Sequence, residues 1–241
     1  MALIVCFANQ KGGVGKSTAV VLAAGALSAA PFSYRTAVVD LDPQQSVSRL
    51  RSYDLEEYTE ALAYDVLTYN LATFTARLAD LEQRYELILL DVAGKLDTAA
   101  GKHSEALQVI QYADVVFIPV TPGNFAIEAT LDYIRAALAI RNLRPALRLI
   151  AFRNMARTRS VATRRLSGEL ADLERLADVP VMRAGLRRYT EFEDANTLRS
   201  LYDPAATQPA LVNFREWLDE LHARIFTETP TVQGVQENTN V

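Results

Sequence analysis

The chain has little of what builds disulfide-linked, metal-cluster and membrane proteins. Its one cysteine, Cys6, leaves no internal disulfide and no C-x-x-C metal or cluster site, which fits a reducing cytosol. No run of 18 or more apolar residues could span a membrane, and no signal peptide is expected before the first apolar stretch. The two histidines, His103 and His222, are far apart and have no companion ligands. These absences predict a cytoplasmic protein.

What the 241 residues do contain is ample material for a core. Half of them are apolar, and the formal net charge of −4 gives no overall sign of nucleic-acid binding. Charge is uneven along the chain, however. Residues 135–199 hold 14 arginines, no lysine and 7 acidic residues, whereas residues 1–130 hold 9 basic and 15 acidic residues. This asymmetry predicts one basic face on an otherwise acidic protein.

Apolar runs alternate with helical stretches, the pattern of repeated βαβ units and a mostly parallel sheet. The expected strands are 3–8, 36–41, 87–90, 115–120, 147–152 and a short 180–182. The expected helices are 17–30, 71–84, 98–111, 125–140, 161–177 and a last one with an apolar stripe over 211–225. Segment 44–67 is mixed and polar, which predicts short surface helices. Residues 1–226 are expected to form one domain, and 227–241 a disordered polar tail.

The run 9–18, Asn-Gln-Lys-Gly-Gly-Val-Gly-Lys-Ser-Thr, stands between the first strand and the first helix. This is the context of a phosphate-binding loop, in which backbone N–H groups and a helix N-terminus face an anion. Lys16 would lie near the β- and γ-phosphates, and the Ser17 hydroxyl would bind Mg²⁺. The fold class expected is therefore α/β, a P-loop NTPase with helices on both faces of its sheet. Gln10 stands where the usual spacing has its first glycine, and Lys11 adds a second lysine to the loop.

Two acids follow apolar strands, and ligands of open parallel sheets bind at the carboxyl ends of strands. Asp91 ends the strand 87–90 and is the expected Walker B acid for Mg²⁺. Asp40 ends the second strand, where it could orient the water that attacks the γ-phosphate and contribute to the metal site. The alternative for either acid is a loop or helix cap. The predicted metal ligands are Ser17, Asp40 and Asp91.

The runs 11–18 and 40–44, the latter Asp-Leu-Asp-Pro-Gln, resemble the deviant Walker A ATPases of the ParA/MinD superfamily. The resemblance implies that Lys11 reaches across a dimer interface to the partner's nucleotide, while Lys16 contacts phosphate in its own subunit. It implies that Thr18 contacts phosphate and that Asp40 activates water. The implied catalytic residues are Lys11, Lys16 and Asp40. The implied nucleotide-binding residues are Lys11, Gly12, Gly13, Val14, Gly15, Lys16, Ser17, Thr18 and Asn154.

Within the superfamily, the chain is most similar to DNA partition ATPases of the short type without an N-terminal helix-turn-helix domain. That resemblance implies ATP and Mg²⁺ as cofactors, a homodimer in the ATP state, and non-specific double-stranded DNA as a partner. It also implies a ParB-like or ribbon-helix-helix centromere-binding protein that stimulates hydrolysis, and a nucleoid-associated location. No membrane partner is expected, because the tail after Phe226 has no basic residue. One departure is 91–94, Asp-Val-Ala-Gly, where many relatives have Asp-Thr-Pro-Pro.

Two further sets of residues are candidates. Asn154 follows the strand 147–152 and could contact the adenine edge, or it could be a turn asparagine. Arg183, Arg187 and Arg188 could contact DNA phosphates without reading bases. Two other functions stay open: a ParA-like ATPase that positions a protein cargo on the nucleoid, and a P-loop enzyme that acts on a small molecule.

Overall fold

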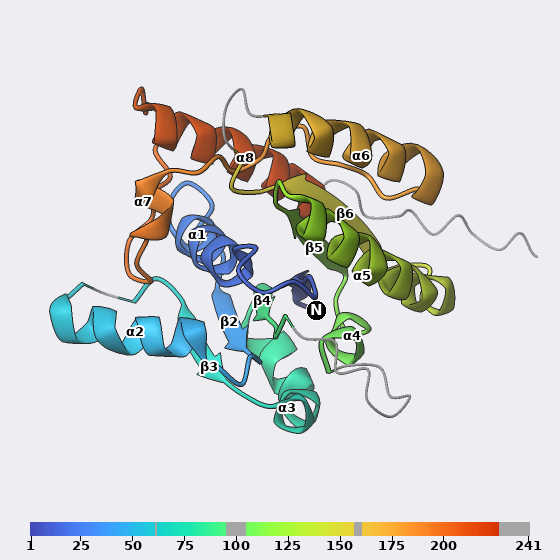
Figure 1. The fold of residues 1–241 in the computed structure, drawn as a ribbon. Coiled ribbons are helices and arrows are strands. Elements are labelled where there is room, and N and C mark those ends of the chain that lie inside the picture. Colours follow the sequence, from blue (N-terminus) through green and yellow to red (C-terminus); the bar gives the residue numbers. More distant parts are fainter. Residues whose placement is uncertain (61, 95–104, 157–160, 227–241) are drawn as a thin grey trace, which may run out of the picture.

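The computed structural model describes residues 1–60, 62–94, 105–156 and 161–226. Six parallel strands form one sheet in the order β3-β2-β4-β1-β5-β6 (Figure 1). The strands are β1 (Leu3–Phe7), β2 (Thr36–Asp40), β3 (Asp65–Thr68), β4 (Leu87–Asp91), β5 (Val115–Val120) and β6 (Arg148–Arg153). The predicted parallel sheet is confirmed.

Helices cover both faces of this sheet, as predicted. They are α1 (Lys16–Ser28), α2 (Ser46–Glu57), α3 (Leu71–Arg84), α4 (Glu105–Ile110), α5 (Asn124–Leu143), α6 (Val161–Ala177), α7 (Thr190–Glu193) and α8 (Pro209–Phe226). Alternate residues of β1 enter two separate apolar clusters, because successive strand side chains point to opposite faces. One cluster includes residues of α3, α4, α5 and α6, and the other includes residues of α1, α2, α7 and α8.

Two expectations need correction, and two others extend outside the described residues. The polar segment 44–67 contains one twelve-residue helix, α2, and the edge strand β3, which was not expected. The short strand expected at 180–182 is only an isolated bridge between Val181 and Ala151. In the expected helix 98–111 the described part is α4, and the expected tail 227–241 lies outside the described residues.

The helix that follows the first strand, α1, is buried nearly all round. Ten of its thirteen residues are buried, which is typical of a helix inside a core rather than on a surface. Its neighbour α8 adds Trp217, which is fully buried and has its ring centroid 5.8 Å from that of Phe152 and 6.5 Å from that of Phe7. The first strand and first helix are therefore held firmly on both sides.

The register of the sheet brings the candidate acids to one edge. Asp91 of β4 is the Cα partner of Asp40 in β2 on one side and of Phe7 in β1 on the other. Because the strands are parallel, their carboxyl ends meet here, and the glycine-rich loop leaves β1 at the same edge. The nucleotide motifs of the sequence are thus neighbours in space.

The outer edge of β6 is covered by the chain that follows α6. Ala151 accepts a hydrogen bond from the backbone N–H of Met182 and donates one to Pro180, and Leu186 donates to the carbonyl of Arg153. The short strand β3 therefore forms the open edge of the described sheet. No helix among the described residues has the length and apolar character needed to cross a membrane.

Candidate nucleotide site

The glycine-rich loop depends on Gly15 for its last turn into α1. Gly15 has a φ of +83°, which side chains disfavour, and a Cβ there would lie 2.5 Å from Nδ2 of Asn154. Nδ2 of Asn154 donates a 2.7 Å hydrogen bond to the carbonyl of Val14, and the Met155 side chain lies against the same turn. The residue after β6 therefore clamps the end of the loop.

The N-terminus of α1 is free to receive an anion. Among the described residues no side chain caps it, so its first backbone N–H groups have no side-chain partner there. Lys16, in its first turn, is only 7% exposed, and its ammonium donates to the carbonyl of Lys11 at 3.5 Å. Burial lowers the pKa of Lys16, while the carboxylates of Asp91 and Asp42 act in the opposite direction. A phosphate at this point would supply the counter-charge that the buried ammonium lacks.

The carboxyl group of Asp91 is buried and unpartnered. Its residue has no exposed surface, and neither oxygen has a hydrogen-bond partner among the described residues. Burial raises its pKa to about 7, and the neighbouring Ser17 side chain and Lys16 ammonium oppose that rise. An unpartnered carboxylate beside a hydroxyl is a donor set that suits Mg²⁺, which takes one or two protein oxygens and completes its shell with phosphate and water. Ser17 and Asp91 therefore fit the predicted metal site.

The other strand-end acid, Asp40, has its hydrogen-bonding capacity largely used. Its Oδ2 accepts from the backbone N–H of Ser48 at 2.9 Å and from the Ser48 hydroxyl at 2.8 Å, and its Oδ1 accepts from the N–H of Asp42 at 3.2 Å. Asp40 thus fixes the first turn of α2 to the end of β2. The predicted roles of Asp40 toward water and metal stay predictions.

Sequence reasoning missed Gly94 as a site residue. A Cβ on Gly94 would lie 2.8 Å from Nζ of Lys16 and 3.3 Å from the backbone nitrogen of Gly12. The chain after β4 therefore passes directly over the loop, and only a residue without a side chain fits there undisturbed. The sequence contains a sign of it, because residues 91–94 are Asp-Val-Ala-Gly where many relatives have Asp-Thr-Pro-Pro. That difference points to the loop only once β4 is known to lie beside β1.

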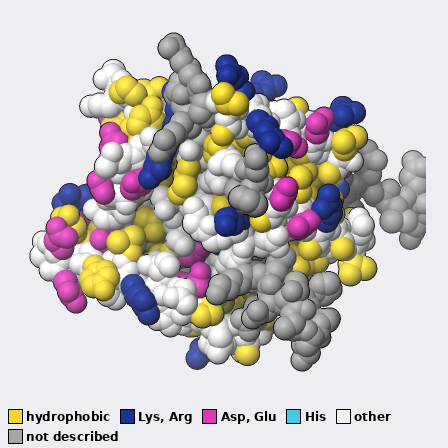
Figure 2. All heavy atoms as spheres, viewed as in Figure 1, with side chains coloured by type: hydrophobic (Ala, Val, Ile, Leu, Met, Phe, Trp, Pro, Cys, Tyr) yellow, Lys and Arg dark blue, Asp and Glu magenta, His cyan; other side chains and the backbone are white. Residues whose placement is uncertain are grey.

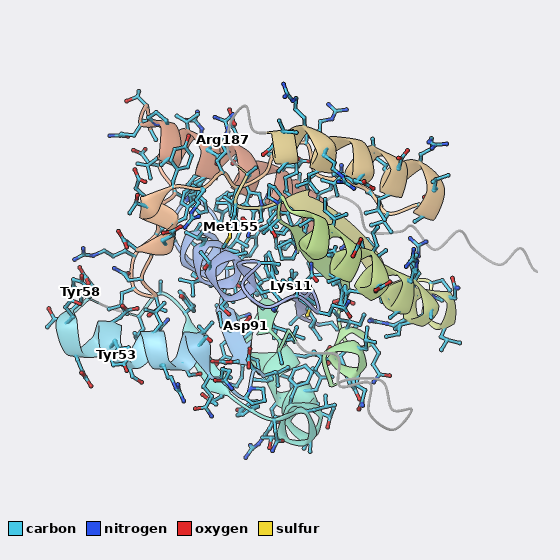
Figure 3. All side chains as sticks on the ribbon, in the orientation of Figure 1. Lys11, Tyr53, Tyr58, Asp91, Met155 and Arg187 are labelled. Atoms are coloured by element: carbon cyan, nitrogen blue, oxygen red, sulfur yellow. The ribbon has the colours of Figure 1, made fainter. Side chains whose placement is uncertain are left out.

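The two lysines of the loop have opposite environments. Lys16 is buried, whereas the Lys11 side chain is exposed. Figure 3 shows Lys11, Met155 and Asp91 grouped at the centre of the molecule, while Tyr53 and Tyr58 lie out on α2 and just beyond it. One lysine is thus buried in the site, and the other is exposed on the same loop.

Comparison with known proteins shows which family has a nucleotide-binding domain of this kind. The family model "CobQ/CobB/MinD/ParA nucleotide binding domain" matches residues 5–196. The chain belongs to this family. Residues 11–18 and the acids Asp40 and Asp91 all lie inside the matched range, so the loop described above is the loop of a family nucleotide-binding domain.

Two curated relatives of this family member have names that state a function. "Maintenance of carboxysome distribution protein A" of Gloeobacter kilaueensis is 31% identical over 135 residues, which cover 56% of this chain and 56% of that protein. "Chromosome-partitioning ATPase Soj" of Thermus thermophilus is 30% identical over 177 residues, 61% of this chain and 66% of that protein. The chain therefore spans between about half and two thirds of these relatives' own lengths.

A solved structure agrees with the fold. Cobyrinic acid a,c-diamide synthase from Mycobacterium smegmatis, solved with a bound ATP analog and magnesium, superposes with a TM-score of 0.68 at 19% identity. The superposition covers 97% of this chain and 100% of that one. At this identity the likeness concerns the fold alone, and it confirms the predicted P-loop NTPase architecture.

The bonds of Asn154 in this family member favour the alternative of a turn asparagine over an adenine contact in the free protein. Besides its bond to Val14, its Oδ1 accepts from the backbone N–H of Met155 at 3.0 Å, and the residue is only 4% exposed. Its amide is therefore committed to the loop in the free protein. Contact with adenine stays a prediction, and the observed bonds assign Asn154 first to loop geometry.

Most described arginines of the basic segment are used within the fold. Arg141 donates to carbonyls at the end of α6, Arg148 donates to carbonyls of α8, and Arg144 pairs with Asp114. Of the predicted DNA group, Arg188 pairs with Glu193 at 2.9 Å. Figure 2 shows dark blue side chains along α6 with acidic ones among them.

The other two members of the predicted DNA group are exposed and have no side-chain partner among the described residues. Arg183 and Arg187 share this property with Arg164 on α6 among the described arginines of 135–199. Figure 3 shows Arg187 toward the upper edge, away from the loop. Contact of Arg183, Arg187 and Arg188 with DNA stays a prediction, and Arg157 and Arg159 lie outside the described residues.

Proposed function

We propose that this family member is a Mg²⁺-dependent ATPase that dimerises with ATP, binds double-stranded DNA non-specifically in the cytoplasm and segregates a plasmid or chromosome on the nucleoid. Hydrolysis to ADP and phosphate is slow and is stimulated by a ParB-like or ribbon-helix-helix centromere-binding protein, which releases the dimer from DNA. The resemblance to partition ATPases and the similarity to Soj support this proposal.

The observation that carries the proposal is the contrast between the two lysines of one loop. Lys16 is buried beside Asp91 and serves the nucleotide of its own subunit. Lys11 is exposed, so in the proposed dimer its ammonium is available to the nucleotide of a second copy. A cation supplied by the partner stabilises the charge of phosphoryl transfer only after two subunits meet, as an arginine finger does. Hydrolysis is thereby tied to assembly.

The remaining residues have simple tasks in this scheme. The N–H groups of the loop and of the first turn of α1 bind the phosphates, and Ser17 and Asp91 would hold Mg²⁺. When bound, Mg²⁺ neutralises charge on the phosphate oxygens. Asp40 orients the attacking water through the carboxylate that also anchors α2.

The first prediction concerns Lys11→Ala. The variant should bind a fluorescent ATP analogue within about twofold of the original affinity, because the in-cis contacts remain. It should lose ATP-dependent dimerisation in sedimentation velocity. Its turnover should fall by ~100-fold or more; ~100-fold is a conservative minimum, because an arginine finger contributes about 10³–10⁵.

Arg77→Ala is the matched control for this experiment, because Arg77 is an exposed cation on α3 whose side chain is 63% exposed. The control should dimerise and turn over ATP normally. A Lys11→Ala protein that still forms the ATP dimer and hydrolyses at the original rate would rule out the partner-supplied lysine.

Two other functions share this site. A ParA-like ATPase that positions a protein cargo is supported by the similarity to the carboxysome distribution protein, and a small-molecule P-loop enzyme is supported by the fold shared with the diamide synthase. ATP-dependent retardation of duplex DNA separates the small-molecule enzyme from the two DNA-bound switches. The exposed second lysine of the loop favours the switches, because their proposed mechanism uses a cation that a partner subunit supplies.

A further inference from the structure

Asn9, the residue before Gln10, is one of the most fully hydrogen-bonded side chains of the site. It is 1% exposed, and its Nδ2 donates to the carbonyl of Pro119 at 2.9 Å and to the hydroxyl of Thr130 at 2.8 Å. Its Oδ1 accepts from the backbone N–H of Lys11 at 3.0 Å. One amide therefore ties the beginning of the loop to β5 and α5 and sets the backbone of Lys11.

Gln10 adds a second tie to the same helix. Its Nε2 donates to the carbonyl of Ala129 at 2.6 Å, one residue before Thr130 in α5. A glycine, which the usual phosphate-loop spacing has at this point, could not make this bond. The replacement of glycine by glutamine thus has a physical consequence, which is an anchor on α5 on the side where Lys11 emerges.

These ties leave Lys11 with a fixed backbone and an exposed side chain. Its N–H is held by Asn9, its carbonyl accepts from the ammonium of Lys16, and its own side chain is exposed. A residue that must meet a reacting group on another subunit gains from such pre-orientation, because misplacement by about 1 Å can cost 100-fold in rate.

We propose that Asn9 and Gln10 are positioning residues that anchor the loop on α5 so that Lys11 is directed toward the nucleotide of a second copy of this chain. The inference rests on the proposed function of Lys11. It goes beyond that function because it attributes the direction of Lys11 to two hydrogen bonds with α5, Asn9 to Thr130 and Gln10 to Ala129. These bonds can be removed by substitution while Lys11 is kept.

The test uses Gln10→Met, which keeps the length of the side chain and removes the bond to Ala129. Its kcat for ATP should fall about five- to tenfold and its ATP-dependent dimer should weaken by a similar factor, with KM for ATP within twofold of the original. Thr130→Val, which removes one partner of Asn9 at constant shape, should act in the same direction. These mild variants are used instead of Asn9→Ala, which would leave the buried carbonyl of Pro119 without its hydrogen-bond donor and could prevent folding.

The same substitution made in the Lys11→Ala protein distinguishes a positioning role of Gln10 from a purely structural one. In the Lys11→Ala protein, adding Gln10→Met should change the residual kcat less than twofold, because no lysine remains to be directed. Asn70→Ala is the matched control: it removes an asparagine that caps α3 through a bond to the N–H of Thr73, far from the loop. It should leave kcat and the dimer unchanged.

Three results would overturn the inference. They are an equal fall in both backgrounds, an unchanged kcat in Gln10→Met, or a raised KM with unchanged kcat, which would mean that the bond serves the chain's own nucleotide. Failure of the proposed function looks different. There Lys11→Ala itself would keep the original turnover, whatever Gln10→Met does.

Discussion

At the scale of single residues, Asp91 and Asp40 end neighbouring strands yet differ in chemical state. Asp40 accepts three hydrogen bonds, whereas the equally buried Asp91 accepts none among the described residues. A buried carboxyl group without partners is destabilised in its charged form. The fold therefore keeps Asp91 in a costly environment, which is typical of a group that serves a ligand rather than the fold.

The second prediction is that Asp91→Asn stabilises the ligand-free protein increasingly as pH rises. The pKa of Asp91 is about 7 in the fold against 3.8 ordinarily, so the folded state holds a proton that the unfolded state has released between these values. The free energy of unfolding therefore falls as pH rises from about 4 to 7, and the neutral amide of the variant avoids that fall. At about 1.4 kcal/mol per pKa unit the difference is a few kcal/mol at most. Thermal melts at pH 5 and pH 8 measure the difference.

Asp80→Asn is the control for this effect, since Asp80 has a side chain that is 65% exposed on α3. Its difference from the original protein should not grow with pH. A Tm difference for Asp91→Asn that is the same at both pH values would contradict the raised pKa of Asp91.

At the scale of elements, the sequence predicts well where apolar periodicity is strong. The helices at 71–84 and 161–177 and the strand at 115–120 have the predicted bounds, because their patterns are long and uninterrupted. The failures are α2 and β3. Of the twelve residues of α2, three are buried, Val47, Arg51 and Asp54, so its attachment to the core is largely polar and leaves no apolar stripe to read.

The attachment of α2 could not be foreseen because its partners are distant in sequence. Arg51 donates to the hydroxyl and carbonyl of Thr197, to the carbonyl of Tyr64, and lies over the Tyr64 ring at 4.5 Å. Asp54 accepts from both the N–H and the hydroxyl of Thr197 at 2.6 Å. In the site, likewise, the loop and its acids were predictable as motifs, whereas the contacts of Asn9 and Gly94 required the arrangement of β4, β5 and α5.

The third prediction is that Thr197→Val destabilises the protein by about 1–3 kcal/mol, because it leaves buried charged groups with lost partners. The hydroxyl it removes both accepts from Arg51 and donates to Asp54. Urea unfolding measures the change. Thr207→Val, at an exposed position, should stay within about 0.5 kcal/mol. Equal midpoints for the two variants would show that the network does not hold α2.

At the scale of the whole molecule, charge has to be counted after pairing. The basic segment 135–199 looks strongly cationic in sequence, but Arg135, Arg165 and Arg175 pair with acids three or four residues away on their own helices. Arg141 and Arg148 donate their hydrogen bonds to carbonyls at the ends of helices. The cations available to a partner are thus fewer than the composition indicates, and the unpaired ones are the better guide to a DNA surface.

The fourth prediction concerns the unpaired group. Replacing Arg164, Arg183 and Arg187 with alanine should weaken ATP-dependent DNA binding at least ~10-fold at 0.1 M salt. It should also reduce the slope of log affinity against log salt by about 3, since each lost phosphate contact removes about 0.9. Fluorescence anisotropy over a salt series measures both quantities.

The matched control replaces three exposed arginines that are each paired on their own helix, Arg77, Arg135 and Arg175. It removes the same net charge and should leave the salt slope nearly unchanged. Equal weakening by both triple variants would mean that net charge alone governs binding.

The open edge of the sheet has a consequence for behaviour at high local concentration. The strand β3 has four residues, and its Asp65 accepts from the Tyr85 hydroxyl at 2.5 Å and lies 4.0 Å from Arg84. The opposite edge is covered along β6 by the segment after α6. Short, charged and covered edges give incoming strands no template, which protects against aggregation by edge-to-edge pairing. In the proposed function many copies gather on DNA, and there these edges would limit edge-to-edge pairing between neighbouring copies.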